Sequence, residues 1–229
     1  MSEPGSRRGR VHDAEGAREA ILNAAEEVFA EHGFDGARID AIAKVAGYNK
    51  SLIFQYYGDK LHLYAAVVRR ADAEMSVVQN QLYASLLDED TVTNAHKFKT
   101  LLRTAIGSFF DYMVAHPRFM RIMTWEMAEG WHTFAQIFSE RDIEDVYQFR
   151  DLLARAQDAG LLRPGVDTMI QILMTTYFFC MCYLASVPLY KMVLPGEDVS
   201  SPAALARARE YIVDFVIHGM VIDPVETKP

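Results

Sequence analysis

Cysteine is nearly absent from this chain, whose 229 residues include only Cys180 and Cys182, both in one apolar run. A spacing of two places their side chains on different sides of a helix, where they cannot easily form a disulfide. The sequence therefore excludes a disulfide scaffold and fits a reducing compartment. The opening residues, MSEPGSRRGR, also lack the apolar core of a signal peptide, so we expect a cytoplasmic protein.

Positive charge is scarce, because 23 Lys and Arg face 31 Asp and Glu, for a formal net charge of -8. Taken alone, this balance argues against a nucleic-acid-binding protein. The deficit is uneven, however: residues 1–70 carry ten basic and ten acidic side chains, whereas residues 71–229 carry thirteen and twenty-one. The net negative charge lies in the last two-thirds, and the N-terminal part is balanced.

Long uncharged runs are also rare, and the one from Thr168 to Tyr190 has the length of a membrane span. Polar residues inside the run, including Gln171 and Ser186, and the helix-breaking Pro188 argue against a span. We interpret the run as a helix that is buried within the protein or lies at an oligomer interface, and we expect no membrane partner.

Enzyme motifs are missing, since the sequence has no H-E-x-x-H, P-loop, dinucleotide fingerprint or G-x-S-x-G. Glu129 and His132 have an E-x-x-H spacing that would put two metal ligands on one helical face. A four-helix di-metal site needs two such motifs, however, and Gly130 interrupts this one. We therefore expect no catalytic residues, no metal site and no cofactor.

Strand-like alternation is absent too, and every periodic segment has helical spacing, which predicts an all-α fold of about nine helices. Asn49, Asp59 and Asp167 precede three of these helices and are predicted N-caps, and Ser201-Pro202 is expected to start the last helix. The polar residues 88–94 are predicted to form a loop. The helices are expected over residues 17–32, 39–46, 50–57, 61–82, 98–115, 117–128, 131–159 (with a possible break near 139–142), 168–190 and 202–218.

Three parts are expected along the chain. Residues 1–16 are polar and basic and suggest a flexible arm, residues 17–75 form a small helical domain, and residues 76–229 form a larger one. The apolar stripe over 61–82 is about 33 Å long at 1.5 Å per residue, so its helix should run out of the first domain into the second.

Two short helices joined by a turn at Gly47 have helix-turn-helix spacing, in which the second helix enters the major groove of DNA. Ile53, Phe54 and Tyr57 are expected to anchor this second helix inward. Its outward positions then offer an ammonium and a phenol to phosphates and an amide to base edges. These positions are Lys50, Ser51, Leu52, Gln55 and Tyr56.

Residues 17–68 resemble the DNA-binding domain of the TetR family of bacterial transcriptional regulators. The resemblance rests on the pairs Gly33-Phe34, Ile42-Ala43, Ala46-Gly47, Ile53-Phe54, Tyr56-Tyr57 and Asp59-Lys60. It implies that Lys50, Ser51, Leu52, Gln55 and Tyr56 contact bases and phosphates, and that Lys60 meets a phosphate at the start of the fourth helix.

Three departures from the family pattern stand out. Arg38 follows Ala37 where the family usually places Thr or Ser, so an electrostatic contact from Arg38 replaces a capping hydroxyl. Leu52 stands where Thr is usual and can touch a thymine methyl group but cannot hydrogen-bond. Phe54 replaces Tyr and lacks its hydroxyl. Leu52 in particular indicates an operator that differs from the family's usual one.

In the family that the sequence resembles, the C-terminal region dimerises and holds a small-molecule pocket. The apolar run 168–190 and the last helix support a homodimer through the last two helices, because they carry more apolar surface than one small domain readily hides. Such a dimer would present two reading helices to a palindromic double-stranded DNA operator.

Large apolar and aromatic side chains in this region suggest a cavity for a small hydrophobic effector, with Glu126 and His132 as its polar groups. The alternative, that these side chains only fill the core, stays open. The candidates are Phe109, Met113, Met123, Trp125, Glu126, His132, Phe138, Tyr147, Met174, Tyr177 and Phe178.

These observations predict a homodimeric DNA-binding transcriptional regulator, a repressor released by an apolar or aromatic effector. A second hypothesis is a helical ligand-binding or metal-dependent enzyme that uses its N-terminal unit only for packing.

Overall fold

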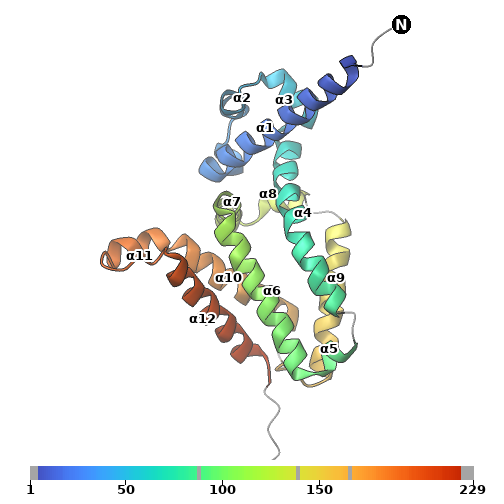
Figure 1. Ribbon diagram of the computed structural model, residues 1–229, viewed down its shortest axis with the longest axis vertical. Coiled ribbons are helices and arrows are strands. Elements are labelled where there is room, and N and C mark those ends of the chain that lie inside the picture. The colour runs from blue at the N-terminus through green and yellow to red at the C-terminus, as the bar shows by residue number, and fades with distance from the viewer. Residues whose placement is uncertain (1–4, 87–88, 138–139, 165–166, 223–229) are drawn as a thin grey trace, which may run out of the picture. The chain divides into compact units, whose positions relative to one another are not determined.

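The computed structural model describes residues 5–86, 89–137, 140–164 and 167–222. These residues form twelve helices and no strand, apart from one isolated bridge between Leu162 and Val221 (Figure 1). The all-α prediction is confirmed, with more helices than the nine expected. They are α1 (Gly5–Gly36), α2 (Ile39–Ala46), α3 (Lys50–Tyr57), α4 (Lys60–Leu86), α5 (Glu89–Thr93), α6 (Ala95–Ala115), α7 (Pro117–Ala128), α8 (His132–Ile137), α9 (Glu140–Asp158), α10 (Thr168–Ala185), α11 (Val187–Val193) and α12 (Pro202–Met220).

The chain divides into two compact units. The first unit contains residues 1–73 and 117–137, and the second contains residues 74–116 and 138–229. The division near residue 73 lies close to the expected domain boundary, but α7 and α8 join the first unit. Helix α4 contributes residues to both units.

The core of the first unit is built on aromatic contacts between α1 and α4. Phe29 meets Tyr64 edge-on with ring centroids 4.9 Å apart, and Phe34 meets Tyr64 at 5.2 Å. Gly33 breaks the helical course of α1 with a φ of 68°. Such a φ favours glycine, and a Cβ at this position would also lie 3.1 Å from the Trp125 ring. The kink therefore turns Phe34 back onto the core, as expected for a glycine at a helix end.

Helix α7 belongs to the first unit because it packs along α1. Trp125 Nε1 donates to the carbonyl oxygen of Ala30 over 3.2 Å, and Arg121 Nε donates to the same oxygen over 3.1 Å. Arg118 forms an ion pair with Glu27 at 2.7 Å. These contacts join residues about ninety positions apart. The sequence prediction, which relied on local helical spacing, could not detect them and placed α7 in the second domain.

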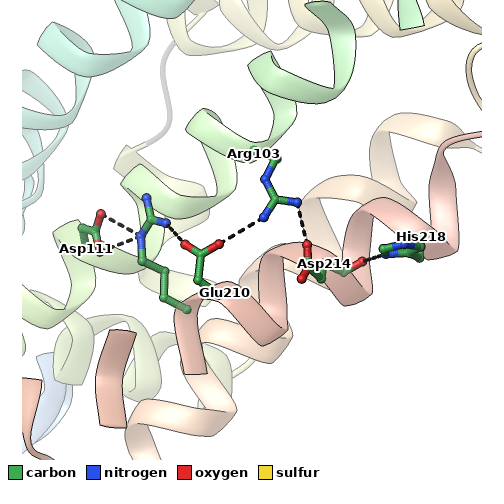
Figure 2. A network of polar contacts seen from close by, with 6 residues as sticks. Arg103, Asp111, Glu210, Asp214 and His218 are labelled. Carbon is green, nitrogen blue, oxygen red and sulfur yellow. Dashed lines mark hydrogen bonds and ion pairs between the residues drawn. The ribbon is translucent and has the colours of Figure 1, made fainter. Parts of the chain in front are cut away.

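The second unit is held together by α6, which packs against α10 and α12. Charged side chains line the contact between α6 and α12: Arg103 bonds Asp214 at 2.5 Å and Glu210 at 3.0 Å (Figure 2). The network continues through Arg209, which pairs with Asp111 at 2.9 Å. The Arg209 guanidinium lies directly over Gly107, where any Cβ would collide with it.

Two segments differ from the sequence prediction. The predicted loop 88–94 contains the short helix α5, because Val92 is buried and anchors the segment. The apolar run 168–190 is divided into α10 and α11, since Pro188 fits the first turn of a helix but cannot continue one. Helix α1 also begins at Gly5, well before the expected start at Ala17, so residues 5–16 of the expected flexible arm are helical.

Among the described residues, α10 is the one helix with the length and hydropathy of a membrane span, and 28% of it is buried. Both cysteines lie on α10 and are free, as expected. Its exposed apolar residues, Ile170, Leu173, Met174 and Phe178, form an apolar surface that the described part of the chain leaves exposed.

Candidate nucleic-acid interface

Helices α2 and α3 form the predicted helix-turn-helix. Gly47 ends α2 with a φ of 74°, the left-handed conformation that glycine adopts most easily. The Asn49 side chain then caps α3 by accepting a 2.9 Å hydrogen bond from the Leu52 amide. The bounds of both helices agree with the prediction.

Two residues of α3 fix it to the first unit. Ile53 is only 1% exposed, and the Tyr57 hydroxyl donates to the Arg18 carbonyl oxygen of α1 over 3.1 Å. Burial is the main cause of a raised pKa at Tyr57, so this phenol stays protonated as a donor. The inward positions expected for these two residues agree with the structure.

The expectation that Phe54 also points inward is wrong, because its side chain is 45% exposed. Ile53 and Tyr57 are four residues apart and share the inward face of α3, whereas Phe54 follows Lys50 by four and shares its outward face. The same spacing, read from the sequence, would have identified Phe54 as an outward residue.

The outward face of α3 carries the predicted reading residues. Lys50, Ser51 and Gln55 are exposed, while Leu52 and Tyr56 are half-buried. Lys50 forms a 2.5 Å ion pair with Asp40 in the first turn of α2. Both side chains remain largely in solvent, so this pair is weak and a phosphate group can compete with the carboxylate for the ammonium.

A second cation lies beside α3. The Arg18 guanidinium sits over the Tyr56 ring, 4.9 Å from its centroid. At exposed sites, such a cation–π interaction contributes about 0.5–1 kcal/mol of stabilising free energy. Arg18 was not among the predicted contacts, because it lies on α1, far from the motif in sequence. Only the folded arrangement brings its charge to this surface.

Arg38 occupies the N-cap position of α2, where its side chain makes no capping hydrogen bond. Its side chain is exposed, and it lies at the helix end where the backbone dipole is positive. This arrangement agrees with the loss of a capping hydroxyl inferred from the sequence.

Lys60 opens α4 but its ammonium has partners within the first unit. Its Nζ lies 3.3 Å from the Asp35 carbonyl oxygen and 4.5 Å from the Phe34 ring centroid. Partial burial is the main cause of a lowered pKa at Lys60. Asp59 caps the same helix by accepting a 2.8 Å hydrogen bond from the His62 amide. A phosphate at this position would have to compete with the carbonyl for the ammonium.

The predicted effector residues fall in both units. Phe138 lies outside the described residues. Met123, Trp125, Glu126 and His132 belong to the first unit, and Phe109, Met113, Tyr147, Met174, Tyr177 and Phe178 belong to the second. Within the second unit, Phe109 contacts Tyr177 with ring centroids 6.1 Å apart and Met113 is buried, whereas Tyr147, Met174 and Phe178 are exposed.

Glu126 is fully engaged within the first unit. Its carboxylate accepts a 2.6 Å hydrogen bond from the Tyr64 hydroxyl and a 3.0 Å hydrogen bond from the Phe134 amide. Burial and this hydrogen bond raise the pKa of Tyr64, which keeps the phenol protonated. Glu126 therefore joins α4, α7 and the start of α8.

His132 and Glu129, the two residues of the E-x-x-H spacing, flank a tight turn. The His132 Nδ1 lies 2.5 Å from the Glu129 carbonyl oxygen, and Gly130 takes a φ of 74° between them. Within the described ranges, no group of three or more His, Cys, Asp or Glu side chains could hold a metal ion.

The second unit also contains an open hollow of about 630 Å³ between α10, the turn before α12, and α12 itself. Tyr183, Arg207 and Tyr211 are among its lining residues, and none of the predicted effector residues lines it. Its lining residues all lie between positions 183 and 212, and helical periodicity does not indicate that α10, the turn and α12 enclose a hollow.

Comparison with known proteins identifies both parts of the chain. Residues 21–67 match the family described as bacterial regulatory proteins, tetR family, and residues 99–216 match the one described as tetracyclin repressor-like, C-terminal domain. The second match alone covers more than half of the chain.

Two curated relatives are named as repressors. The transcriptional repressor NicS of Pseudomonas putida is 27% identical over 214 residues, which cover 92% of this chain and 95% of NicS. The repressor SCO4008 of Streptomyces coelicolor is 30% identical over 157 residues, 68% of this chain and 72% of that protein. Among solved structures, SCO4942 of Streptomyces coelicolor has a TM-score of 0.59 with 26% identity, covering 89% of this chain and 98% of SCO4942.

Proposed function

Because the chain belongs to the TetR family, it is a DNA-binding transcriptional regulator and not an enzyme, and we propose that it is a repressor that a small apolar effector releases from a palindromic operator. The repressor assignment is supported by NicS and SCO4008, which are both named as transcriptional repressors. The regulator acts in the cytoplasm. No described residue group favours the metal-dependent enzyme as a second candidate.

The exposed face of α3 is the observation that carries the DNA-binding proposal. Ile53 and Tyr57 hold the helix against α1, which leaves its opposite face free to enter a major groove. Gln55 is the residue that can read a base edge through its amide, and Leu52 can contact a thymine methyl group. The proposed contacts are Arg38, Lys50, Ser51, Leu52, Gln55, Tyr56 and Lys60, to which Phe54 and Arg18 are added.

Phosphate contacts supply the affinity in this proposal. Arg38 stands at the N-terminus of α2, which no side chain caps, and its guanidinium and the helix end both attract an anion, whereas Asp40 adds a negative charge in the first turn. Lys50 and Arg18 add charge along α3, and Lys60 adds it at the start of α4. The N-terminal part is balanced in charge overall, and these cations would supply its phosphate contacts although the whole chain has a net charge of -8.

Family members bind operators as dimers, and we assign the dimer contact of this chain to α10 and α12. Apolar side chains remain exposed on both helices, including Met174 and Phe178 on α10 and Tyr211 and Phe215 on α12. Phe179 and Phe215 contact each other with ring centroids 4.8 Å apart, which links the two surfaces. A two-fold axis through this patch would bury it against its own copy.

The effector is proposed to bind among the apolar side chains of the second unit. The contact between Phe109 and Tyr177 and the buried Met113 provide an adaptable apolar wall. Binding there would favour a dimer conformation with lower operator affinity. Residues of α4 occur in both units, so this helix is the element through which the change would reach α3.

A gel-shift assay with DNA upstream of the chain's own coding region tests the proposal. The Lys60→Ala variant should weaken binding to all sequences alike, whereas Gln55→Ala should change which base is preferred at one position of each half-site. A Tyr56→Ala/Lys60→Ala double variant with undiminished operator affinity would overturn the contact assignment.

A further inference from the structure

Helix α10 carries a buried hydroxyl group that has no partner in the part of the chain that the structure describes. Thr176 is 9% exposed, and its Oγ1 accepts and donates no hydrogen bond there. A helical threonine can satisfy its hydroxyl by donating to the carbonyl oxygen four residues earlier. Thr100, Thr104 and Thr124 all do so here, each over 2.9 Å. A buried hydroxyl without a partner destabilises the fold, so Thr176 needs another explanation.

The position of Thr176 shows which part of the second unit the hydroxyl faces. It lies on the buried stripe of α10, at four-residue spacing between Ile172 and Cys180. At the start of this stripe, the Thr168 hydroxyl donates to Gln157 Oε1 of α9 over 2.6 Å. The next residue after Thr176, Tyr177, contacts Phe109 of α6. Helix α10 packs against α6, α9 and α12, so this buried stripe faces the interior that these helices share.

The surroundings of the hydroxyl limit what it can bind. No residue from Thr168 to Ala185 is charged, and burial raises the pKa of the Cys180 thiol to about 12, so this neighbour is neutral as well. A charged ligand would lose its hydration here without gaining a counter-charge from α10. A neutral ligand with one polar atom would lose little and would satisfy the hydroxyl.

We propose that Thr176 Oγ1 is the hydrogen-bonding anchor for the effector, and that the effector is an uncharged, mainly apolar molecule with a single hydrogen-bond donor or acceptor. A hydroxyl both donates and accepts, so either a phenol or a ketone fits. The inference rests on the proposed function, because it names the ligand class of the effector region.

Matched pairs of small molecules test the assignment on the full-length protein. One pair is 4-butylphenol and 4-butylanisole, which differ by a hydroxyl donor, and the other is butyrophenone and butylbenzene, which differ by a carbonyl acceptor. Dissociation constants are measured by calorimetry for wild type, for Thr176→Val, which keeps the shape but removes the hydroxyl, and for Thr176→Ser, which keeps the hydroxyl. Thr175→Val is the matched control, because Thr175 is the half-buried neighbour on a different face.

Wild type should bind the polar member of at least one pair about 3- to 10-fold more tightly than its apolar partner. The preference should persist in Thr176→Ser and Thr175→Val and disappear in Thr176→Val. Without ligand, Thr176→Val should melt about 2–4 °C above wild type, because the unpaired hydroxyl is gone.

Three results would each overturn the proposal: wild type shows no preference or no binding in both pairs, Thr176→Val keeps the preference, or ligand-free Thr176→Val melts no higher than wild type. Operator binding by the ligand-free protein is measured separately. Failure to bind DNA would refute the proposed function, whereas the ligand measurements, which do not involve DNA, would still test the role of Thr176.

Discussion

Tyr64 donates a buried hydrogen bond of 2.6 Å to Glu126, which joins α4 to α7 inside the first unit. The other carboxylate oxygen of Glu126 accepts from the Phe134 amide at the start of α8. A buried carboxylate needs hydrogen-bond donors. Leaving it without one destabilises the fold by more free energy than a typical hydrogen bond contributes.

Replacing Tyr64 with Phe should therefore destabilise the protein by about 1–3 kcal/mol, since it leaves a carboxylate oxygen buried without a donor. Urea unfolding followed by circular dichroism measures the loss. Tyr48→Phe is the control, because Tyr48 is an exposed tyrosine of the same unit, and it should change stability by less than about 0.5 kcal/mol. Equal effects of the two substitutions would show that the Tyr64 hydroxyl contributes nothing specific.

The two faces of α3 should respond oppositely to alanine. Ile53→Ala removes a fully buried side chain and should cost about 2–4 kcal/mol of unfolding free energy. Phe54→Ala removes an exposed side chain and should cost less than about 1 kcal/mol while weakening operator binding. Thermal unfolding and gel shifts on the same preparations separate the effects. An unstable Phe54→Ala variant would indicate that Phe54 packs inward after all.

Much of the fold follows from local signals in the sequence. The side chains of Asn49 and Asp167 cap α3 and α10 as predicted, because capping depends on residues only three positions apart, and α12 begins at the predicted Pro202. Both helices of the helix-turn-helix also have the predicted bounds, since the glycine and the cap that delimit them are adjacent in sequence.

The missed features depend on contacts between distant residues. The Trp125 ring packs against Gly33 and its Nε1 donates to the Ala30 carbonyl oxygen, which places α7 in the first unit. The periodicity of α7 does not predict these contacts. The position of the Arg18 guanidinium over the Tyr56 ring likewise depends on a contact between residues that are distant in sequence. In the candidate site, Phe54 is the exception: its outward position was implied by simple helical spacing, and its aromatic character favoured the wrong interpretation.

The N-cap of α4 should give stability a specific dependence on pH. The His62 amide is the main cause of a lowered pKa at Asp59, with a further contribution from the His62 side chain. Since the folded-state pKa lies below the unfolded value, the carboxylate contributes stability above pH about 4 and loses it as the pH falls through the folded-state pKa.

Melting temperatures of wild type and Asp59→Asn across this range test the effect. Wild type should be the more stable protein at pH 7, and the difference should shrink steadily as the pH falls from about 5 to 2. A difference that stays constant over this range would show that the charge of Asp59 has no role in the cap.

The proposed dimer surface can be tested with a single charge. Phe178→Asp places a carboxylate in the exposed apolar patch of α10 and should shift the protein towards monomer, because an unpaired charge cannot be buried at an interface without a large penalty. Sedimentation equilibrium measures the change. Met127→Asp, at an exposed apolar residue of the first unit, should leave the association unchanged. A Phe178→Asp dimer as tight as wild type would exclude this surface.

The most direct measurement of the central claim is footprinting and salt titration on the operator found upstream of the chain's own coding region. A homodimer that reads DNA with two copies of α3 should protect two half-sites about 34 Å apart, or a multiple of that distance, on one face of the duplex. Its affinity should fall steeply as salt rises. A single protected site, or an affinity that does not change with salt, would contradict the account.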